Sequence, residues 1–382
     1  MSEDTEFGQP EPWVDAPLQA IKGRGAVTNL AGRFETQLIE TVDDGWASYR
    51  DDTCINPALN TSVTPELAKT ILSRNQSPDL PFSVSLNPYR GCEQGCVYCF
   101  ARPTHAYLGL SPGLDFETRL YAKTNAPELL RRELAHHQYQ PSPIALGINT
   151  DAYQPVERAL HITRQCLEVL HECRHPVGII TKSALIERDL DLLRPMAERN
   201  LLAAAITITT LDHRIARSLE PRAASPTRRL QTIEKLAQAG IPVLVSVAPV
   251  IPFITEQALE KVMHAAASAG ATAAGYTVLR LPWEVNPLFQ QWLQTHFPER
   301  AQRVMNRIRD MRGGKDYDAN FATRMRGEGL WADMIRQRFA KALKRYGLNK
   351  SGCFVQLDCS QFRRPLQIPA AGSSSGQLDI FG

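Results

Sequence analysis

Three cysteines stand within eight residues of the chain, at Cys92, Cys96 and Cys99, and no fourth cysteine lies close to them in the sequence. Closed structural zinc sites and most iron-sulfur clusters take four protein ligands. Three thiolates, separated by three and then two residues, can hold one small inorganic centre and leave one metal position open. An open metal position is typical of catalysis, so we expect these three residues to be both metal ligands and the catalytic centre.

Four interpretations of this cysteine loop are open. A four-iron four-sulfur (4Fe-4S) cluster with one free iron agrees with the spacing, with the aromatic residue Tyr98 and with the flanking residues. A closed zinc site with His105 as fourth ligand is the second, although zinc ligands generally come as short-spaced pairs set well apart. Disulfides and unconnected buried cysteines are the other two, and both fit poorly with the composition of the loop.

The loop resembles a known family. Its spacing, with an aromatic residue directly before the last cysteine, is the pattern of the radical S-adenosylmethionine (SAM) superfamily, and Tyr98 stands in the aromatic place. The wider stretch from Asn87 to His105 resembles the bacterial branch close to spore photoproduct lyase, often labelled DNA repair photolyase-like and largely uncharacterised. The resemblance extends from about Gly23 to the C-terminus.

This resemblance implies a reaction and two cofactors, a 4Fe-4S cluster and SAM. SAM would chelate the free iron, an electron would enter from the cluster, and the resulting 5′-deoxyadenosyl radical would abstract hydrogen. In such enzymes the cofactor supplies the hard chemistry, and the protein orients and shields it. A reductant such as flavodoxin or ferredoxin would be a partner.

The resemblance also implies residues that bind SAM. Thr150 stands where the lyases have a hydroxyl-bearing SAM contact, and Lys182 matches a SAM-contacting lysine. The other expected cofactor-binding residues lie near them or in the cysteine loop: Tyr98, Asp151, Ser183 and Thr207. Plainer interpretations stay open, because Asn149 and Asp151 could bond backbone amides in a turn and Lys182 could be a surface residue.

A further group follows the fourth expected strand. Thr207 and Thr209 end this strand, and Glu220, Pro221 and Arg222 come after it. These residues either line the site or, in the case of the threonines, simply suit a strand.

One position departs from the lyase pattern. Photoproduct lyases return a hydrogen to the product radical through a cysteine just before the residues that match 149–151, and this chain has Ile148 there. Isoleucine cannot donate hydrogen in this way, and nothing in the sequence brings Tyr153 or Cys166 near the radical. The standard repair of the spore photoproduct is therefore not expected.

Alternating strands and helices must position these residues. Six short apolar runs are expected to form strands: 83–86, 144–148, 177–180, 201–208, 243–247 and 273–279. Helical stretches separate them, which predicts a parallel sheet with right-handed crossovers. The resemblance makes this α/β fold a partial TIM barrel, (β/α)6, of the radical SAM type. Ligands gather at the carboxyl ends of the strands in such folds.

Local signals punctuate several helices. The apolar residues of 126–136 recur at helical spacing. Ser225 is expected to cap a helix with Pro226 in its first turn, and Gly240 to end it. Thr255, followed by Glu256, is expected to cap another helix.

Composition and charge bound the organisation of the chain. Its 382 residues are 43% hydrophobic and 22% charged, as in a globular protein. We expect an N-terminal extension (1–80), the barrel (81–285), a basic helical C-terminal region (286–365) and a flexible tail (366–382). The sequence has neither a run of about 18 to 20 apolar residues nor a signal-peptide pattern, so the expected location is cytoplasmic. The remaining cysteines are expected to be reduced: Cys54, Cys166, Cys173, Cys353 and Cys359.

Positive charge is concentrated after the barrel. Residues 283–350 hold fourteen Lys and Arg against seven Asp and Glu, a net charge of +7. The cations recur along two expected helices: Arg300, Arg303, Arg307, Arg309 and Arg312, then Arg336, Arg338, Lys341, Lys344 and Arg345. With Trp331 and Phe339 interleaved, this surface could follow a phosphate backbone. The alternative is a solvated helix face whose aromatic residues belong to the core.

The C-terminal tail contains a second candidate for partner binding. After a flexible linker, the chain ends with Gln377, Leu378, Asp379, Ile380 and Phe381, followed by one glycine. These residues resemble the pentapeptide with which bacterial replication and repair proteins bind the DNA sliding clamp, a peptide mode of recognition. A terminal strand or helix docked on the barrel is the alternative.

Taken together, the residues predict a radical SAM enzyme that acts on DNA or on a DNA-bound partner by repair-type lesion chemistry. A radical SAM enzyme that modifies RNA or a protein side chain is an alternative. A clamp-associated iron-sulfur binding protein without catalysis is another. The glycine-rich basic segment 22–25 lacks a full phosphate-binding spacing, so it is assigned no cofactor and is expected to pack along the barrel.

Overall fold

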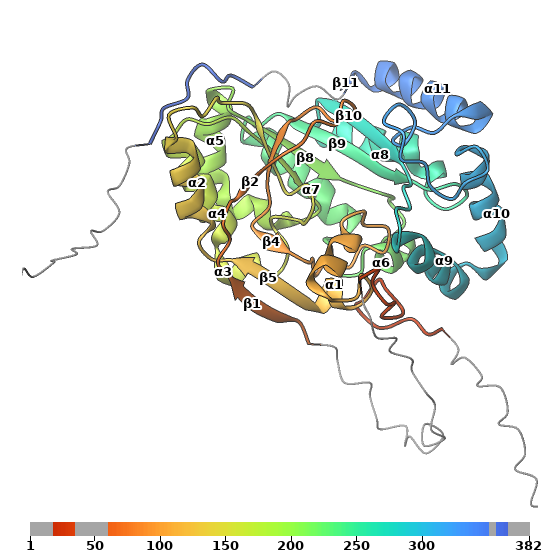
Figure 1. Cartoon of the computed structure of the whole chain (residues 1–382). Coiled ribbons are helices and arrows are strands. Elements are labelled where there is room, and N and C mark those ends of the chain that lie inside the picture. Colours follow the sequence, from red (N-terminus) through yellow and green to blue (C-terminus); the bar gives the residue numbers. More distant parts are fainter. Residues whose placement is uncertain (1–17, 35–59, 351–356, 366–382) are drawn as a thin grey trace, which may run out of the picture.

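The computed structural model describes residues 18–34, 60–350 and 357–365. Its main sheet has eight strands in the order β11-β10-β9-β8-β7-β6-β3-β2 (Figure 1). The strands are β2 (Leu72–Arg74), β3 (Val84–Leu86), β6 (Ile144–Leu146), β7 (Val177–Thr181), β8 (Leu202–Thr207), β9 (Val243–Val250), β10 (Ala273–Val278) and β11 (Asn349–Lys350). All neighbouring pairs are parallel except β2 with β3. The six expected strands are confirmed as β3 and β6 to β10.

Helices connect the parallel strands, as the alternating pattern predicts. They are α2 (Ala126–Ala135), α3 (Glu157–Leu160), α4 (Ile162–Glu172), α5 (Leu190–Glu198), α6 (His213–Leu219), α7 (Pro226–Gln238) and α8 (Leu259–Ser268). Short 3-10 helices add η3 (Ala184–Asp189) and η4 (Glu256–Ala258). In the described part of the chain β2 and β11 form the two edges of the sheet, so the fold is a partial barrel of the expected α/β class.

A small second sheet adjoins the cysteine loop, and the apolar runs did not predict it. It has the order β1-β5-β4, with β1 at Ser62–Glu66, β5 at Arg119–Lys123 and β4 at Tyr89–Arg90. Strand β4 ends directly before the loop, and η2 (Arg102–Leu108) and α1 (Asp115–Thr118) follow it. Strand β1 is mostly exposed and β4 has only two residues, so neither carries the hydrophobic periodicity by which strands are found in a sequence.

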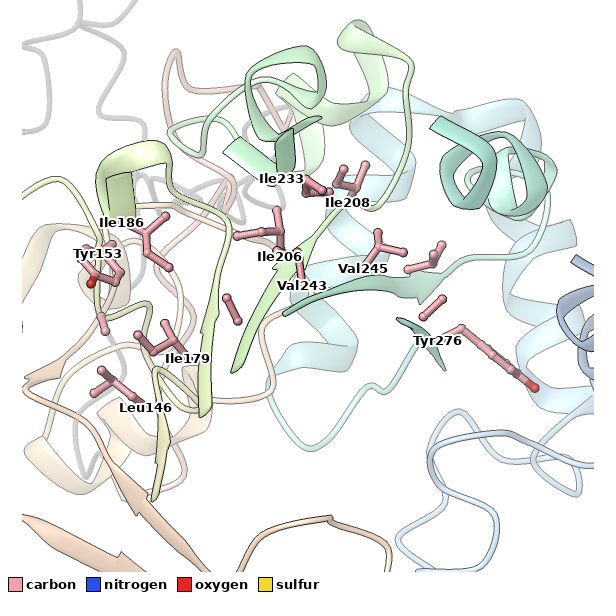
Figure 2. Packing of buried hydrophobic residues seen from close by; sticks show 14 of the residues in the cluster. Leu146, Tyr153, Ile179, Ile186, Ile206, Ile208, Ile233, Val243, Val245 and Tyr276 are labelled. Carbon is pink, nitrogen blue, oxygen red and sulfur yellow. The ribbon is translucent and has the colours of Figure 1, made fainter. Parts of the chain in front are cut away.

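The hydrophobic core lies along the parallel strands. Figure 2 shows Leu146, Ile179, Ile206 and Val245 following one another across neighbouring strands. All four side chains are buried, and apolar residues of the helices pack against them, as Ile233 of α7 does. A parallel sheet covered by helices produces such near-continuous apolar strands.

The helix caps agree with the sequence in one case and differ in another. The Ser225 hydroxyl accepts a hydrogen bond from the amide of Arg228, and Gly240 has φ = 76° after α7, as predicted. The expectation for Thr255 was wrong, because its side chain caps no helix. Its hydroxyl instead accepts from the amide of Ile251 and donates to the carbonyl of Pro249, so it stabilises the turn after β9.

The C-terminal region is helical, with α9 (Val285–His296), α10 (Pro298–Asp310) and α11 (Gly329–Tyr346) on one side of the barrel (Figure 1). Two expectations about its surface were wrong. Trp331 and Phe339 are buried, because they form the face of α11 that packs on the core. Arg312 is also buried, and its guanidinium donates to the carbonyls of Thr323 and Leu279. Among the described helices, none is long and apolar enough to cross a membrane.

Candidate functional site

The cysteine loop, residues 92–99, lies beyond the carboxyl end of β3. Cys92 and Cys96 are buried, and Cys99 is half-buried. The amide of Cys92 donates to the carbonyl of Phe116 at 2.8 Å, and the amide of Val97 donates to the carbonyl of Leu219 at 3.1 Å. Both ends of the loop are therefore fixed to other segments through their backbone.

The N-terminal segment, residues 18–34, holds the loop from another side. The carboxylate of Glu117 accepts hydrogen bonds from the amides of Gly25 and Ala26 at 3.0 and 2.8 Å. It also pairs with Arg102 at 2.5 Å, and both charged side chains are fully buried. A Cβ atom on Gly25 would lie 1.8 Å from the carbonyl oxygen of Gly95. The segment and the loop can therefore touch only because residue 25 is glycine.

Sequence reasoning missed this role. The glycines at Gly23 and Gly25 were visible, but we compared them only with phosphate-binding patterns. The useful signal was that a close backbone contact also requires glycine. The expectation that residues 22–25 pack along the barrel is confirmed, and the contact is with the cysteine loop itself.

Tyr98 connects the loop to the region after β8. Its hydroxyl donates to the carboxylate of Glu220, and the Thr209 hydroxyl donates to the same carboxylate at 2.6 Å. Glu220 is paired with the buried guanidinium of Arg229, which also donates to the carbonyl of Thr207 at 2.9 Å. Thr209 and Glu220, which were expected after the fourth strand, thus lie next to the cysteine loop. Arg229 is an additional member of this group that sequence reasoning missed, because it lies on a helix 22 residues along the chain from Thr207.

Lys182 extends from the end of β7 toward the loop. Its ammonium nitrogen lies 5.9 Å from the centre of the Tyr98 ring, within cation-π range. Burial acts to lower the pKa of Lys182, but the nearby Cys96, Glu220 and Asp151 outweigh it, so the pKa is raised. Lys182 therefore stays charged beside the cysteine loop.

Asp151 is a hydrogen-bonding centre between the loop and two strand ends. Its carboxylate accepts from the Thr181 hydroxyl at 2.6 Å, from the Lys182 amide at 2.8 Å and from the Gln94 side chain at 2.7 Å. A fourth hydrogen bond comes from the amide of Tyr153. These contacts match the turn interpretation of Asp151. The carboxylate fixes the Lys182 backbone relative to the loop, and its role in binding a cofactor stays a prediction.

The remaining predicted residues lie at the same edge of the sheet. The Thr150 hydroxyl donates to the carbonyl of Tyr89 at 3.1 Å. The Ser183 hydroxyl accepts from the amide of Leu185 and caps η3. Thr207 is buried at the end of β8. All three side chains are near the loop-facing strand ends, and their contacts with a cofactor stay predictions.

Burial and nearby charges act on the thiols of Cys92 and Cys96, and these effects test whether the loop suits an iron-sulfur cluster. Burial raises the pKa of Cys92, and the charges of Asp151, Cys96 and Cys99 raise it further. Burial also raises the pKa of Cys96, to about 12, where Lys182 acts in the opposite direction. Thiols that influence one another's ionisation lie close together, and thiolates are the ligands that iron-sulfur clusters take. The donor set fits such a cluster.

The zinc interpretation finds no support in the described residues. There, no group of three His, Cys, Asp or Glu side chains is placed to hold a single metal ion. Nε2 of His105 lies 2.9 Å from the carbonyl oxygen of Arg119, and its ring packs edge-on against Phe116.

The last candidate residues are the possible hydrogen donors and the clamp-like residues of the tail. Ile148 is half-buried just beyond β6, and Cys166 lies on α4 within the hydrophobic core. The clamp-like residues Gln377 to Phe381 lie outside the described residues.

A cavity of about 340 Å³ lies beside the cysteine loop. Its lining residues are Lys22, Gly23, Arg24, Asn60, Thr61, Glu93 and Arg222. Glu93 pairs with Arg222 at 3.0 Å. Burial lowers the pKa of Arg24, and the nearby Arg222 lowers it further. With three cations and one carboxylate, the cavity has an excess of positive charge.

Comparisons with known proteins agree with this geometry. The family described as the Radical SAM superfamily matches residues 86–266. An uncharacterized protein of Mycobacterium tuberculosis (strain ATCC 25618 / H37Rv) is 34% identical over 274 residues, which cover 70% of this chain and 76% of that protein. An uncharacterized protein of Methanocaldococcus jannaschii is 23% identical over 222 residues, which cover 58% of this chain and 79% of that protein.

Solved structures show the same fold. A mutant of spore photoproduct lyase aligns with a TM-score of 0.54 and 14% identity, covering 84% of this chain and 88% of that chain. Spore photoproduct lyase complexed with dinucleoside spore photoproduct aligns with a TM-score of 0.51 and 14% identity, covering 75% and 81%. A further lyase mutant with bound AdoMet and the same dinucleoside aligns with a TM-score of 0.51.

Proposed function

Because this chain belongs to the radical SAM superfamily, whose enzymes use a 4Fe-4S cluster and SAM, we propose that Cys92, Cys96 and Cys99 hold the cluster and that the enzyme acts on DNA. When bound, these cofactors supply reductive cleavage of SAM and a radical able to abstract hydrogen. A reductant is required for this chemistry. We assign that role to flavodoxin or ferredoxin, and we place the enzyme in the cytoplasm.

The residues around the loop have distinct tasks in this proposal. The three thiols coordinate iron, and a four-iron cluster with three protein ligands keeps one iron free for SAM. Lys182, whose raised pKa keeps it cationic beside Cys96, binds the carboxylate of SAM. Thr150, Asp151, Ser183 and Thr207 belong to the same SAM site, while Tyr98 and its bond to Glu220 orient the loop.

One observation carries the cluster assignment. Cys92 and Cys96 are buried in one short loop, the charges of Cys96 and Cys99 raise the pKa of Cys92, and the cation of Lys182 acts to lower the pKa of Cys96. Buried cysteines of the core, such as Cys166, have no such arrangement, because the pKa of Cys166 responds to burial, Glu157 and Lys123. The loop cysteines therefore differ from structural cysteines in their surroundings.

Several features support DNA as the substrate. Residues 283–350 have a net charge of +7, and the cavity beside the loop has an excess of positive charge suited to a phosphate group. A solved structure with the same fold, that of spore photoproduct lyase, is complexed with a dinucleoside photoproduct. Ile148 removes the cysteine relay of the lyases, so we propose lesion chemistry other than the standard repair of the spore photoproduct.

The DNA assignment is tested by coupling. The enzyme with its cluster reconstituted under anaerobic conditions is given SAM, dithionite and either ultraviolet-irradiated DNA, intact DNA or RNA of the same sequence. We expect DNA to increase the yield of 5′-deoxyadenosine, with mass spectrometry detecting a changed nucleoside. Stimulation by RNA alone, or by a protein extract freed of nucleic acid, would favour the other radical SAM substrates.

The tail adds a route to DNA in this proposal. Gln377, Leu378, Asp379, Ile380 and Phe381 would bind a bacterial sliding clamp, and the preceding linker would keep the enzyme at high local concentration on DNA. A peptide of these residues should bind purified clamp, and a peptide with Gln377 and Phe381 replaced by alanine should not. Equal binding of both peptides would remove the clamp from the proposal.

A further inference from the structure

A cluster of exposed aromatic rings around one arginine lies beside the cysteine loop. The guanidinium carbon of Arg33 is 4.1 Å from the ring centre of Trp283, 5.4 Å from Phe34 and 6.0 Å from Tyr107. The rings of Phe34 and Tyr107 are 5.0 Å apart. We call these four residues, Arg33, Phe34, Tyr107 and Trp283, the aromatic platform.

The platform joins three distant segments at the mouth of the barrel. Phe34 and Arg33 belong to the N-terminal segment, which hydrogen-bonds to α1 and α9 (Figure 1). Tyr107 lies in η2, which follows the cysteine loop, and Trp283 lies in the segment after β10. The carboxyl ends of the strands, where ligands bind in such folds, therefore adjoin the platform.

The rings of the platform are unusually exposed for their size. Phe34, Tyr107 and Trp283 are 55%, 67% and 62% exposed. Large aromatic side chains normally contribute to a core, so several of them together on a surface indicate a binding site. The two aromatic residues expected on the basic helices, Trp331 and Phe339, are buried instead.

Two further observations show that the platform is built and not an accident of exposed loops. Arg33 is fixed by the buried carboxylate of Glu284, which accepts from its side chain at 2.7 Å and from its backbone amide at 3.3 Å. Trp283 has φ = 47°, a left-handed conformation that bulky residues seldom adopt. Such strain persists where surrounding structure holds it, and it clusters at functional sites.

A second cation-aromatic pair includes the residue that directly follows the last cysteine. Phe100 follows Cys99 directly and is 41% exposed, and the guanidinium of Arg280 lies 5.5 Å from its ring centre. Nε of Arg280 is buried and makes no hydrogen bond within the described structure. Arg280 and Trp283 share the segment after β10, so this segment contributes one residue to the pair and one to the platform.

We propose that the aromatic platform binds unpaired DNA by stacking bases on its rings and on the Arg33 guanidinium. Every base has a π face, and aromatic rings with interleaved arginines bind single strands without regard to sequence. When one base stacks on the platform, a neighbouring nucleotide of the same strand would reach the cysteine loop. This arrangement suits an enzyme that must take its target base out of the stack. This inference rests on the proposed DNA substrate and specifies the form in which the DNA binds.

The test uses the enzyme with its reconstituted cluster and a fluorescent oligothymidylate, with binding followed by anisotropy at constant salt. Each stacked base contributes about 1–3 kcal/mol, so Trp283→Ala and Tyr107→Ala should each weaken binding about 5- to 160-fold. Trp283→Phe should restore most of the affinity. Cleavage of SAM without nucleic acid should be unchanged in all three variants, because none of these residues touches the cysteine loop's hydrogen-bond network.

A matched control and a direct measurement keep the test decisive. Phe321 is another exposed aromatic residue, at 46%, and its ring lies under the guanidinium of Arg324. It does not belong to the platform. Phe321→Ala should bind as the wild type does. Photo-crosslinking of the wild type with an oligonucleotide that contains 5-bromodeoxyuridine should attach to Trp283 or Tyr107, which tests the site even where a variant folds poorly.

The outcomes separate the platform from the proposed function. If the oligothymidylate binds and DNA stimulates SAM cleavage, but the platform variants bind normally, the platform proposal is wrong and the DNA assignment stands. If the wild type binds no DNA at low salt, both fail. Tighter binding of oligouridylate, or preference for an intact duplex of the same sequence, would also overturn the proposal.

Discussion

The hydroxyl of Tyr98 donates a hydrogen bond to the carboxylate of Glu220, and this contact joins the cysteine loop to the segment after helix α6. The same carboxylate pairs with Arg229, and both charged side chains are almost fully buried. The position of the loop thus depends on an ion pair in the interior of the protein.

Glu220→Gln should destabilise the protein strongly. It leaves the Arg229 guanidinium buried without its counter-charge, a change that costs about 3–5 kcal/mol of unfolding free energy. Tyr98→Phe removes one hydrogen bond to a charged group and should cost about 1.5–3 kcal/mol. Chemical denaturation of the wild type and of both variants measures these two losses of stability.

The control for this prediction is an exposed ion pair. Glu198 pairs with Arg194 at 3.1 Å on the surface, and Glu198→Gln should change stability by less than about 1 kcal/mol. A Glu220→Gln variant as stable as Glu198→Gln would contradict the assigned role of the buried pair.

Gly25→Ala should impair the cysteine loop without touching a cysteine. The added Cβ would lie 1.8 Å from the Gly95 carbonyl oxygen, so the N-terminal segment or the loop must move. Overpacking of this kind costs about 1–3 kcal/mol. We expect less iron and sulfide per protein after reconstitution, measured by chemical analysis.

Gly23→Ala is the matched change in the same segment. Gly23 has a positive φ, of 75°, and a Cβ there would meet no atom within 4 Å. The Gly23→Ala variant should retain nearly full iron loading despite a small loss of stability. Equal iron loading in both variants would show that the contact between Gly25 and Gly95 does not position the loop.

Lys182→Met should weaken SAM binding. Removal of a hydrogen bond between charged groups costs about 1.5–3 kcal/mol, which corresponds to roughly a 10- to 100-fold increase in the dissociation constant. Equilibrium dialysis of SAM against the protein with its cluster measures this. Lys235→Met removes a lysine of α7 that pairs with Glu187 of η3, and it should leave SAM affinity unchanged. A Lys182 variant that behaves like the Lys235 variant would contradict the assignment.

His175 should make the protein less stable in acid. Burial lowers its pKa to about 4, and its ring is held between the Tyr139 hydroxyl at 2.7 Å and the Pro176 carbonyl at 2.9 Å. The unfolded chain binds the proton at about pH 6.5. Between pH 6.5 and 4 the unfolded state therefore holds more protons, and stability falls as the pH falls.

The expected loss at His175 is about 3 kcal/mol by pH 4, at 1.36 kcal/mol for each unit of the pKa difference. In His175→Gln this part of the pH dependence should disappear, so the stability curves of the two proteins should converge in acid. Parallel curves from pH 7 to 4 would show that His175 does not carry the effect.

The sequence predicts the parallel strands because their apolar runs are short, regular and separated by helices. It also predicts that Lys182 and the cysteine loop lie at the same edge of the sheet, since both follow the carboxyl ends of parallel strands. It does not predict the Glu220–Arg229 pair, because Arg229 lies in a helix whose face toward the strand end depends on packing.

The surface is where prediction from the sequence is weakest. Trp331 and Phe339 looked like partners of a basic surface, but their helical spacing also fits a buried face. Arg33, Phe34, Tyr107 and Trp283 lie in segments without periodicity and far apart in the chain, so only the folded structure brings them together.

The central claim is that Cys92, Cys96 and Cys99 hold a cluster that cleaves SAM. The most direct measurement quantifies 5′-deoxyadenosine after anaerobic reconstitution with SAM and dithionite, in wild type, Cys96→Ala and Cys359→Ala. Cys359 is half-buried and lies outside the loop, so its variant should keep full iron loading and form product as the wild type does. Cys96→Ala should form none, and product formation by that variant at wild-type levels would contradict the account.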